Sequence, residues 1–125
     1  DNGKLQSPEI IEKIESFKKL PIWENKSISK QILDLKINKK INKLLEKSVK
    51  EGTSKAASIK GKKIYGKTGT SDGNKDLWFI GSIDNLTTGI WIGYDDNKES
   101  ELSSGNAAYL WKKFISEIYK IPIKK

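Results

Sequence analysis

Aliphatic residues recur at helical spacing in one lysine-rich part of the chain. The members of this stripe, mostly three or four positions apart, are Ile37, Ile41, Leu44, Leu45 and Val49. Such spacing places apolar side chains on one face of an amphipathic helix. Asp34 is a typical N-cap residue, and Gly52 is a typical residue after the last helical turn. The pattern therefore predicts a helix over residues 35–51.

Farther along, the pattern changes to short runs rich in aromatic and β-branched residues, which favour strands. Residues 77–83 and 87–94 form two such runs, and the turn-forming pair Asp84-Asn85 separates them, which is typical of an antiparallel hairpin. We expect their bulky residues to be core or cross-strand partners: Trp78, Phe79, Trp91 and Tyr94. Ahead of the hairpin, residues 59–67 predict an edge strand that leads into a Thr-Gly-Thr segment.

Both ends of the chain carry shorter patterns. Residues 8–16 alternate imperfectly and predict a strand, and residues 20–24 predict a second one. At the other end a helix is expected to begin near Ser103 or Ser104, with its apolar face formed by Ala108, Trp111, Phe114 or Ile115, and Ile118. Together the elements predict an α+β fold. Its antiparallel sheet is expected to contain the three strands after residue 59 and at least one earlier strand, flanked by helices.

The length of 125 residues suits one domain with a modest core. Cysteine and histidine are absent, which excludes disulfides and thiolate chemistry and argues against a Ser-His-Asp hydrolase or a zinc enzyme. No apolar run is long enough to span a bilayer, and no signal peptide pattern is present. Methionine is absent even at position 1, so we expect the chain to be a piece of a longer protein.

The net charge of +8 originates in the first half of the chain. Residues 1–63 hold 16 lysines and 8 acidic residues, whereas residues 64–125 hold 8 of each. A basic surface attracts nucleic acid, anionic membranes or wall polymers. All 24 basic residues are lysines, however, and bidentate recognition of bases and phosphates favours arginine. We interpret the excess as a solvated lysine-rich face and expect no nucleic-acid partner.

The densest polar chemistry lies in residues 64–71, Ile-Tyr-Gly-Lys-Thr-Gly-Thr-Ser. Gly61, Gly66, Lys67 and Thr68 satisfy the phosphate-loop pattern G-x-x-x-x-G-K-[ST] letter for letter. That loop needs a helix that begins at the lysine and points its N-terminus at the phosphates. The residues after Lys67 are poor helix formers, and a hairpin follows in place of a parallel βαβ unit. Nucleotide binding is therefore only a remote alternative.

A second interpretation places Lys67-Thr68-Gly69-Thr70 along a strand. The period of two then sends Lys67 and Gly69 to one face and Thr68 and Thr70 to the other, unless a bulge at Gly69 re-aims them. A lysine at such a place meets an anion or a serine hydroxyl, and a glycine lets a ligand backbone approach closely. Lys-Thr-Gly, together with S-x-x-K and S-D-N, is the signature set of penicillin-interacting serine acyl enzymes.

Three ordered motifs carry a resemblance to a known family. They are residues 66–71 (Gly-Lys-Thr-Gly-Thr-Ser), residues 76–81 (Asp-Leu-Trp-Phe-Ile-Gly) and residues 91–96 (Trp-Ile-Gly-Tyr-Asp-Asp). Almost end to end, the chain resembles the C-terminal portion of the transpeptidase domain of penicillin-binding proteins, most closely the bifunctional class A type. Gly52-Thr53 resembles the Gly-Thr-Gly segment that precedes the family's motif strand, and Ser54 departs from it where a glycine is usual.

The resemblance implies the β-lactamase and transpeptidase type of α+β fold, with residues 1–125 as a single, partial domain. It implies peptidoglycan cross-linking by acyl transfer from a D-alanyl-D-alanine stem peptide, without a cofactor or a metal. Lys67 and Thr70 are then the catalytic residues: Lys67 assists proton movement and holds substrate, and the Thr70 N–H is one of two oxyanion donors. The substrate-binding residues that it implies are Thr68, Gly69, Thr70 and Ser71. We interpret the following three residues as architecture: Asp76, Trp78 and Gly81.

The same resemblance implies a bacterial parent protein that is anchored in the membrane and works on its outer face, in the periplasm or cell wall. The expected partners are peptidoglycan stem peptides, β-lactams and the upstream part of the same domain. That upstream part would carry the S-x-x-K and S-x-N motifs, and any membrane contact would come through an upstream anchor.

Two stretches match those upstream motifs in their letters. They are Ser27-Ile28-Ser29-Lys30 and Ser104-Gly105-Asn106. We interpret both as chance matches, because the family places its two motifs before Lys-Thr-Gly and because Ser27 would lie in a short connection. Two hypotheses stay open. In the first, the chain is half of an active site that upstream residues complete, and it is catalytically inactive when isolated. In the second, it is a non-catalytic module that kept the fold, either as a truncated duplicate or as a wall-binding domain.

Overall fold

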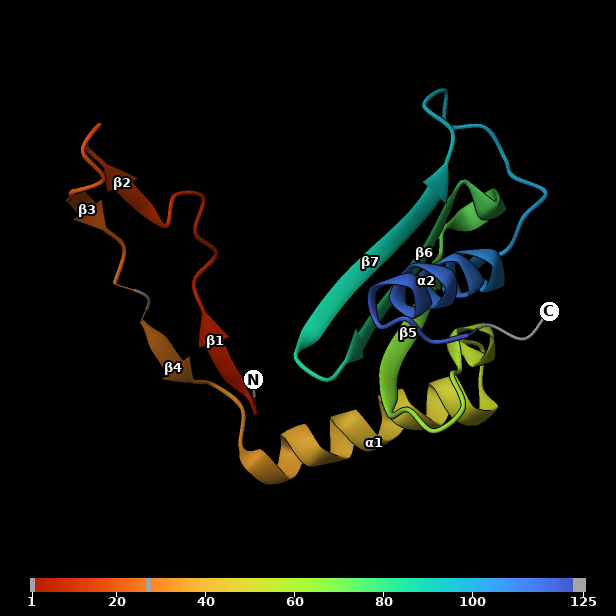
Figure 1. Ribbon diagram of the computed structural model, residues 1–125. Coiled ribbons are helices and arrows are strands. Elements are labelled where there is room, and N and C mark those ends of the chain that lie inside the picture. The colour runs from red at the N-terminus through yellow and green to blue at the C-terminus, as the bar shows by residue number, and fades with distance from the viewer. Residues whose placement is uncertain (1, 27, 123–125) are drawn as a thin grey trace. The chain divides into compact units, whose positions relative to one another are not determined.

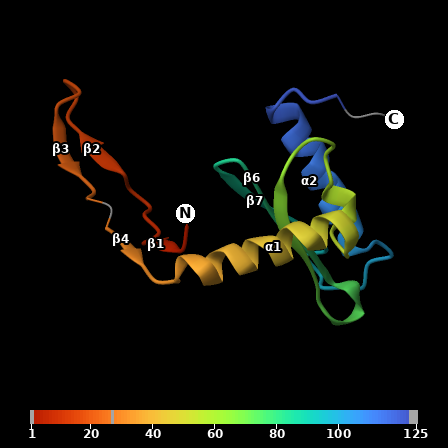
Figure 2. The same ribbon diagram turned by 90° about the horizontal axis from the view of Figure 1, so that it is seen from below.

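The computed structural model describes residues 2–26 and 28–122, and its ribbon is drawn in Figures 1 and 2. The chain divides into two compact units, Asp1–Lys40 and Ile41–Lys125. Helix α1, Leu35–Glu51, crosses the boundary between the two units. All the residues predicted to carry chemistry, 67–71, belong to the second unit.

The first unit contains short, exposed strands that pair in two separate antiparallel sheets. Strand β1, Lys4–Gln6, pairs with β4, Ser29–Gln31, and β2, Lys13–Glu15, pairs with β3, Pro21–Glu24. The strand predicted over residues 20–24 is confirmed as β3. The strand predicted over residues 8–16 is wrong in its first half, because pairing begins only at Lys13. Pro8 lacks the N–H that a strand ladder needs.

Helix α1 has the predicted bounds, Leu35–Glu51. Asp34 caps it as expected, because its Oδ1 accepts a hydrogen bond from the Lys36 N–H at 2.7 Å. Of the predicted apolar stripe, Val49 is buried whereas Leu44 is 69% exposed. The spacing of the apolar residues therefore identified the helix, but it did not identify which of these residues pack against the core. Neither described helix is long and apolar enough to cross a membrane.

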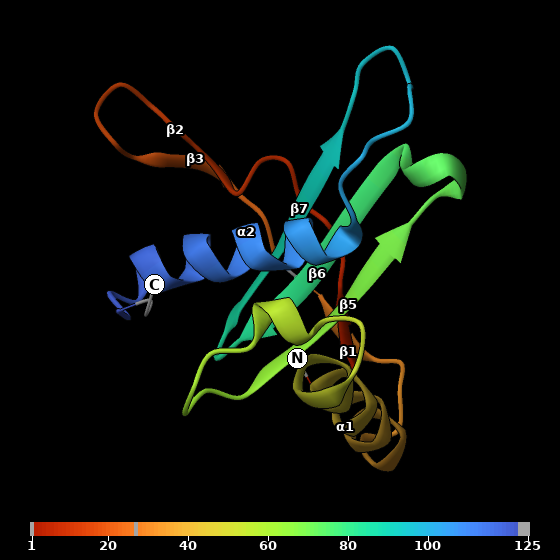
Figure 3. The same ribbon diagram turned by 90° about the vertical axis from the view of Figure 1, so that its right-hand side faces the viewer.

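The second unit is built around a three-stranded antiparallel sheet (Figure 3). Its strands are β5, Ile64–Thr70, β6, Asp76–Ile83, and β7, Leu86–Gly93, in the order β5-β6-β7. The predicted hairpin is confirmed as β6 and β7, and Asp84 takes a φ of 50° in its turn. The edge strand begins later than predicted, at Ile64, and runs to Thr70. The prediction that an earlier strand joins this sheet is wrong for the described residues, since the four earlier, exposed strands pair with one another.

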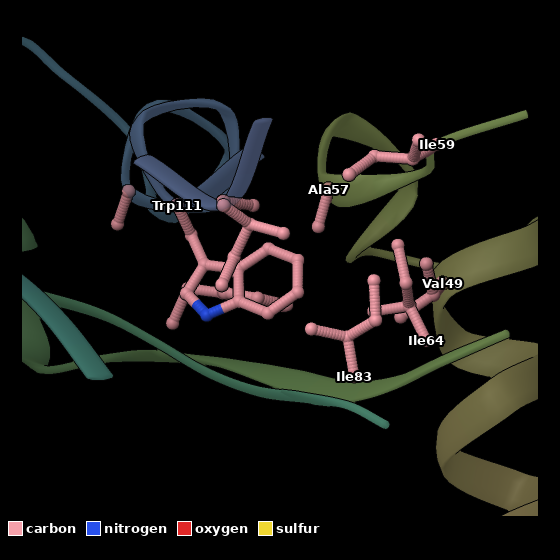
Figure 4. Packing of buried hydrophobic residues seen from close by; sticks show 10 residues of the cluster. Val49, Ala57, Ile59, Ile64, Ile83 and Trp111 are labelled. Atoms are coloured by element: carbon pink, nitrogen blue, oxygen red, sulfur yellow. The ribbon is translucent and has the colours of Figure 1, made fainter. Parts of the chain in front are cut away.

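Helix α2, Ser104–Ile118, packs against the sheet and encloses the core (Figures 3 and 4). Trp111 is fully buried, and its ring meets that of Phe79 edge-on with centroids 5.2 Å apart. Its indole Nε1 donates to Thr88 Oγ1 at 2.7 Å, so the one polar atom of this side chain is satisfied. The other buried members of the core are Val49, Ala57, Ile59, Ile64, Ile83, Ala107, Ala108 and Ile115.

The apolar face predicted for α2 is partly correct. Ala108 and Ile115 are fully buried beside Trp111, whereas Phe114 and Ile118 are 45% and 50% exposed. The buried face of α2 is therefore narrower than the face of apolar residues that the sequence predicted. With helices accompanying antiparallel sheets, the fold is α+β, as predicted.

Candidate functional site

Strand β5 places the predicted site residues on alternating faces, as the period of two requires. Lys67 and Gly69 are exposed, whereas Thr68 is 9% exposed and counts among the buried polar residues. Thr70, the last residue of the strand, is exposed. The register with β6 is continuous from Ile64 to Thr70, so the structure has no bulge at Gly69. All five predicted residues, 67–71, therefore lie together at one strand end.

This geometry contradicts the phosphate-loop alternative. Lys67 lies inside a strand, and no helix begins at that position. The next helical turn, Asp72–Asn74, is a 3-10 turn of three residues. A phosphate loop needs the first N–H groups of a helix beside the lysine. Lys67 lies within the strand β5, which provides no helix N-terminus there.

Lys67 is an exposed cation held by neutral oxygens. Its Nζ donates to the Thr68 carbonyl at 2.9 Å, to Thr68 Oγ1 at 3.3 Å and to Thr53 Oγ1 at 3.4 Å. Among the described residues, no carboxylate lies within ion-pair distance of Lys67. The ammonium therefore has no ion-pair partner among the described residues, and a negatively charged ligand would gain a charge-assisted hydrogen bond there.

Among the described strands, β5 pairs with β6 on one side only, so that its other side is an open edge of the sheet to which alternate residues of β5 direct their backbone groups. Hydrogen-bonded and non-hydrogen-bonded pairs alternate along an antiparallel ladder. Ser71 donates its N–H to the Asp76 carbonyl at 3.0 Å, in register with the ladder. Thr70 and Thr68 then occupy non-hydrogen-bonded positions, so their N–H and C=O groups point away from β6. The bond from Lys67 Nζ to the Thr68 carbonyl agrees with this direction.

Ser71 follows the strand and is tied to the turn that begins there. Its Oγ accepts a hydrogen bond from the Asp76 N–H at 2.8 Å and donates one to Asp76 Oδ2 at 3.1 Å. The other carboxylate oxygen of Asp76 accepts from Trp91 Nε1 at 2.9 Å. The hydroxyl that was predicted to bind substrate is thus engaged within the turn, and Asp76 joins the turn to β7.

Thr53 was not predicted as a site residue, yet it lies against two residues that were. It follows α1 in the chain, and its Oγ1 accepts hydrogen bonds from Thr68 Oγ1 at 2.9 Å and from Lys67 Nζ at 3.4 Å. The adjacent Ser54 is fully buried and shares a 2.9 Å hydrogen bond with Ser48 Oγ. The one sequence signal was the likeness of Gly52-Thr53 to a family segment, which carried no role for the hydroxyl.

The described residues of the two stretches whose letters match the upstream S-x-x-K and S-x-N motifs do not take part in the cluster around Lys67. Asn106 is part of a helix cap: its Oδ1 accepts hydrogen bonds from the Ser103 N–H at 2.9 Å and from Ser103 Oγ at 3.2 Å. Ser29 and Lys30 lie in the exposed strand β4 of the first unit. Ser27 lies outside the described residues, so its expected place in a connection stays a prediction.

The described residues form no metal centre, because no group of three or more His, Cys, Asp or Glu side chains lies close enough together among them to hold a metal ion.

A groove of about 350 Å³ lies in the first unit, lined by Asn2, Lys4, Gln6 and Ser29. It contains none of the residues predicted to carry chemistry. The candidate site is the open edge of β5 around Lys67, where the residues predicted to carry chemistry lie together.

Comparison with known sequences points to a single protein family. A family model described as the penicillin binding protein transpeptidase domain matches residues 1–114. Penicillin-binding protein 4 of Bacillus subtilis (strain 168) is 31% identical over 121 residues, which cover 95% of this chain and 19% of that protein. Penicillin-binding protein 1A of Aquifex aeolicus (strain VF5) is 44% identical over 55 residues, 44% of this chain and 8% of that protein. The chain thus spans less than a fifth of the length of these bacterial relatives.

Solved structures share the fold. Penicillin-binding protein A from M. tuberculosis, in an imipenem acyl-enzyme complex, superposes with a TM-score of 0.73 at 17% identity over 92% of this chain and 27% of that chain. Penicillin-binding protein 1A from Haemophilus influenzae superposes with a TM-score of 0.72 at 19% identity, over 98% of this chain and 25% of that chain.

Proposed function

The chain belongs to the penicillin-binding protein transpeptidase domain family, and on that premise we propose that it supplies the substrate-binding strand of a peptidoglycan D,D-transpeptidase. One observation carries this proposal: Lys67, which has no ion-pair partner among the described residues, lies beside the open edge of β5. The substrate is an extended stem peptide that ends in D-alanyl-D-alanine, and an open strand edge is suited to bind an extended peptide.

In this proposal the site binds the negative end of the peptide. Lys67 provides the charge that attracts the terminal carboxylate and also assists proton movement. Thr68 and Thr70 supply polar groups beside it, and Gly69 lets the peptide backbone approach the strand closely. Ser71 shapes the end of the site through its bonds to Asp76.

The Thr70 N–H is the proposed oxyanion donor of this strand. Its direction away from β6, inferred from the register, supports this role. Two such donors stabilise the negative oxygen that develops when a nucleophile attacks a carbonyl, and the loss of one typically costs about 2.7–4 kcal/mol of transition-state stabilisation. The second donor belongs to the nucleophile itself.

The nucleophile is a serine of an S-x-x-K motif outside residues 1–125, which form one partial transpeptidase domain. The serine Oγ attacks the carbonyl of the penultimate D-alanine, the C–N bond breaks and the terminal D-alanine leaves. The amine of a second stem peptide then takes the acyl group from the serine. β-Lactams acylate the same serine, and the reaction takes place on the outer face of the bacterial cytoplasmic membrane.

A fluorescent penicillin tests this proposal. We expect it to label the full-length protein that contains these residues and to leave the isolated 125-residue chain unlabelled. Covalent labelling of the isolated chain would overturn the assignment of the nucleophile. A folded full-length protein that takes up no label would favour the non-catalytic module.

A further inference from the structure

Two threonine hydroxyls accept hydrogen bonds from the Lys67 ammonium, and they differ in access to solvent. Thr68 is 9% exposed, whereas Thr53 belongs to an exposed stretch at the end of α1. Lys67 Nζ reaches Thr68 Oγ1 at 3.3 Å and Thr53 Oγ1 at 3.4 Å. The three polar groups therefore form one cluster, in which Thr53 is the more exposed of the two threonines.

The protons of this cluster decide which hydroxyl is able to donate to a ligand. A hydroxyl carries one proton and two acceptor lone pairs. Thr68 Oγ1 donates its proton to Thr53 Oγ1 at 2.9 Å, so Thr68 has none left for a ligand in this arrangement. Thr53 Oγ1 accepts from both neighbours, and among the described residues its own proton has no acceptor. The uncommitted proton of the cluster is therefore that of Thr53.

We infer that Thr53 is a further substrate-binding residue, which donates its hydroxyl proton to the carboxylate that Lys67 attracts. In this arrangement Thr68 fixes the position of Thr53 by its own hydrogen bond and leaves the Thr53 proton for the ligand. The inference rests on the proposed transpeptidase function. It predicts that the Thr53 hydroxyl contributes more to the binding of acyl donors that carry a carboxylate than to the binding of their neutral esters, because a hydrogen bond to a charged acceptor is the stronger one.

The test compares two acylating probes, benzylpenicillin and its methyl ester, on the full-length protein. The ester keeps the β-lactam ring but lacks the carboxylate charge. Thr53→Val removes the hydroxyl while it keeps the shape of the side chain, and Thr53→Ser keeps the hydroxyl. Acylation is followed by mass spectrometry over a range of probe concentrations, so that the half-saturating concentration and the limiting rate are obtained separately.

For Thr53→Val we expect the half-saturating concentration of benzylpenicillin to rise about tenfold or more. Acylation by the methyl ester should change clearly less, because a neutral ester carbonyl accepts a weaker hydrogen bond than a carboxylate does, and Thr53→Ser should behave as the unaltered protein does. Thr87→Val is the matched control, because Thr87 on β7 shares a 2.8 Å hydroxyl pair with Ser82 away from Lys67. We expect this control to leave both probes unaffected.

Three outcomes would overturn the inference. Equal losses with the acid and the ester would indicate a general structural role for Thr53, as would a Thr53→Ser variant as impaired as Thr53→Val. An unchanged half-saturating concentration in Thr53→Val would show that the hydroxyl meets no carboxylate. These results leave the proposed function intact, whereas failure of the unaltered protein to react with benzylpenicillin overturns both.

Discussion

Gly66 in β5 and Gly81 in β6 lie directly opposite each other, and the ring of Phe79 fills the space that a side chain at either position would need. A Cβ on Gly66 would lie 2.5 Å from Phe79 Cζ, and a Cβ on Gly81 would lie 2.5 Å from Phe79 Cε1. Phe79 is fully buried, so its ring has little room to move aside. The two glycines thus let the core pack directly against the strand that carries Lys67.

Gly81→Ala should therefore destabilise the chain by about 1–3 kcal/mol through overpacking. The new Cβ would also lie 2.8 Å from Trp111 Cε2. Urea unfolding of the 125-residue chain, followed by tryptophan fluorescence, measures this change. Gly89→Ala on β7 is the matched control, because its nearest neighbour would lie at 3.6 Å, and we expect a change within about 0.5 kcal/mol. Equal effects of the two substitutions would contradict the steric explanation.

Thr88→Val should destabilise the chain for a different reason. It removes the acceptor of the Trp111 Nε1–H, which would be left buried without a hydrogen bond at a penalty of about 1–3 kcal/mol. Thr87→Val alters the neighbouring residue, whose hydroxyl pairs with Ser82 on an exposed part of the sheet. Thermal unfolding of the two variants separates the cases, and an equally stable Thr88→Val variant would show that Trp111 finds another acceptor.

Lys67→Ala should reduce acylation of the full-length protein by a fluorescent penicillin about tenfold or more, since a hydrogen bond to a charged ligand is lost. Its effect on stability should be small, because Lys67 is exposed and bonds only to neutral oxygens among the described residues. Lys67→Arg should restore little activity, since a planar guanidinium does not replace a compact ammonium. The exposed Lys60 provides the control: a Lys60→Ala variant as impaired as Lys67→Ala would point to a general charge effect.

An ion pair on α1 makes stability depend on pH. Lys50 Nζ lies 2.7 Å from Glu46 Oε1, and this hydrogen bond lowers the pKa of Glu46 and raises the pKa of Lys50. Glu46 therefore adds stability above its unfolded pKa of about 4.3, and that stability is lost as the pH falls through the lower folded value. Lys50 adds stability below its unfolded pKa of about 10.4, and that stability is lost as the pH rises through the higher folded value.

Glu46→Gln should consequently flatten the acid side of the stability profile, measured by urea unfolding between about pH 3 and pH 7. The effect should be small and should weaken with salt, because the Lys50 side chain is 61% exposed. Glu51→Gln in the same helix is the control, since Glu51 and Lys47 are 3.9 Å apart and both well exposed. A steeper acid loss in the Glu46→Gln variant would reverse the sign of the argument.

Local patterns predicted the elements well where neighbouring residues decide the structure. The helix over 35–51 has an N-cap at Asp34 and a regular apolar spacing, and the hairpin has its turn at Asp84. The strands β1 and β4 carried no such signal, because each is three polar or exposed residues long. Their pairing joins segments more than twenty residues apart, and nothing in either segment alone specifies the partner.

The sequence predicted the strand that carries the candidate site residues but not the contacts that these residues make. The pattern correctly placed Lys67, Thr68 and Thr70 along a strand, whose geometry sends successive side chains to opposite faces. The contact of Thr53 with Thr68 spans 15 positions and depends on how the end of α1 lies against β5. The engagement of the Ser71 hydroxyl likewise depends on the register that sets Asp76 opposite it.

By itself, then, the sequence determined the helix, the hairpin, the strand position of Lys67 and the likeness to the penicillin-binding transpeptidases, because caps, periods and motifs act between residues close in the chain. The tertiary structure alone decided which apolar residues are buried, that β5 lies at an open edge, and that Thr53 shares the Lys67 ammonium with Thr68. The physical reason is that such contacts arise from strand register and packing between distant segments, which no local pattern encodes.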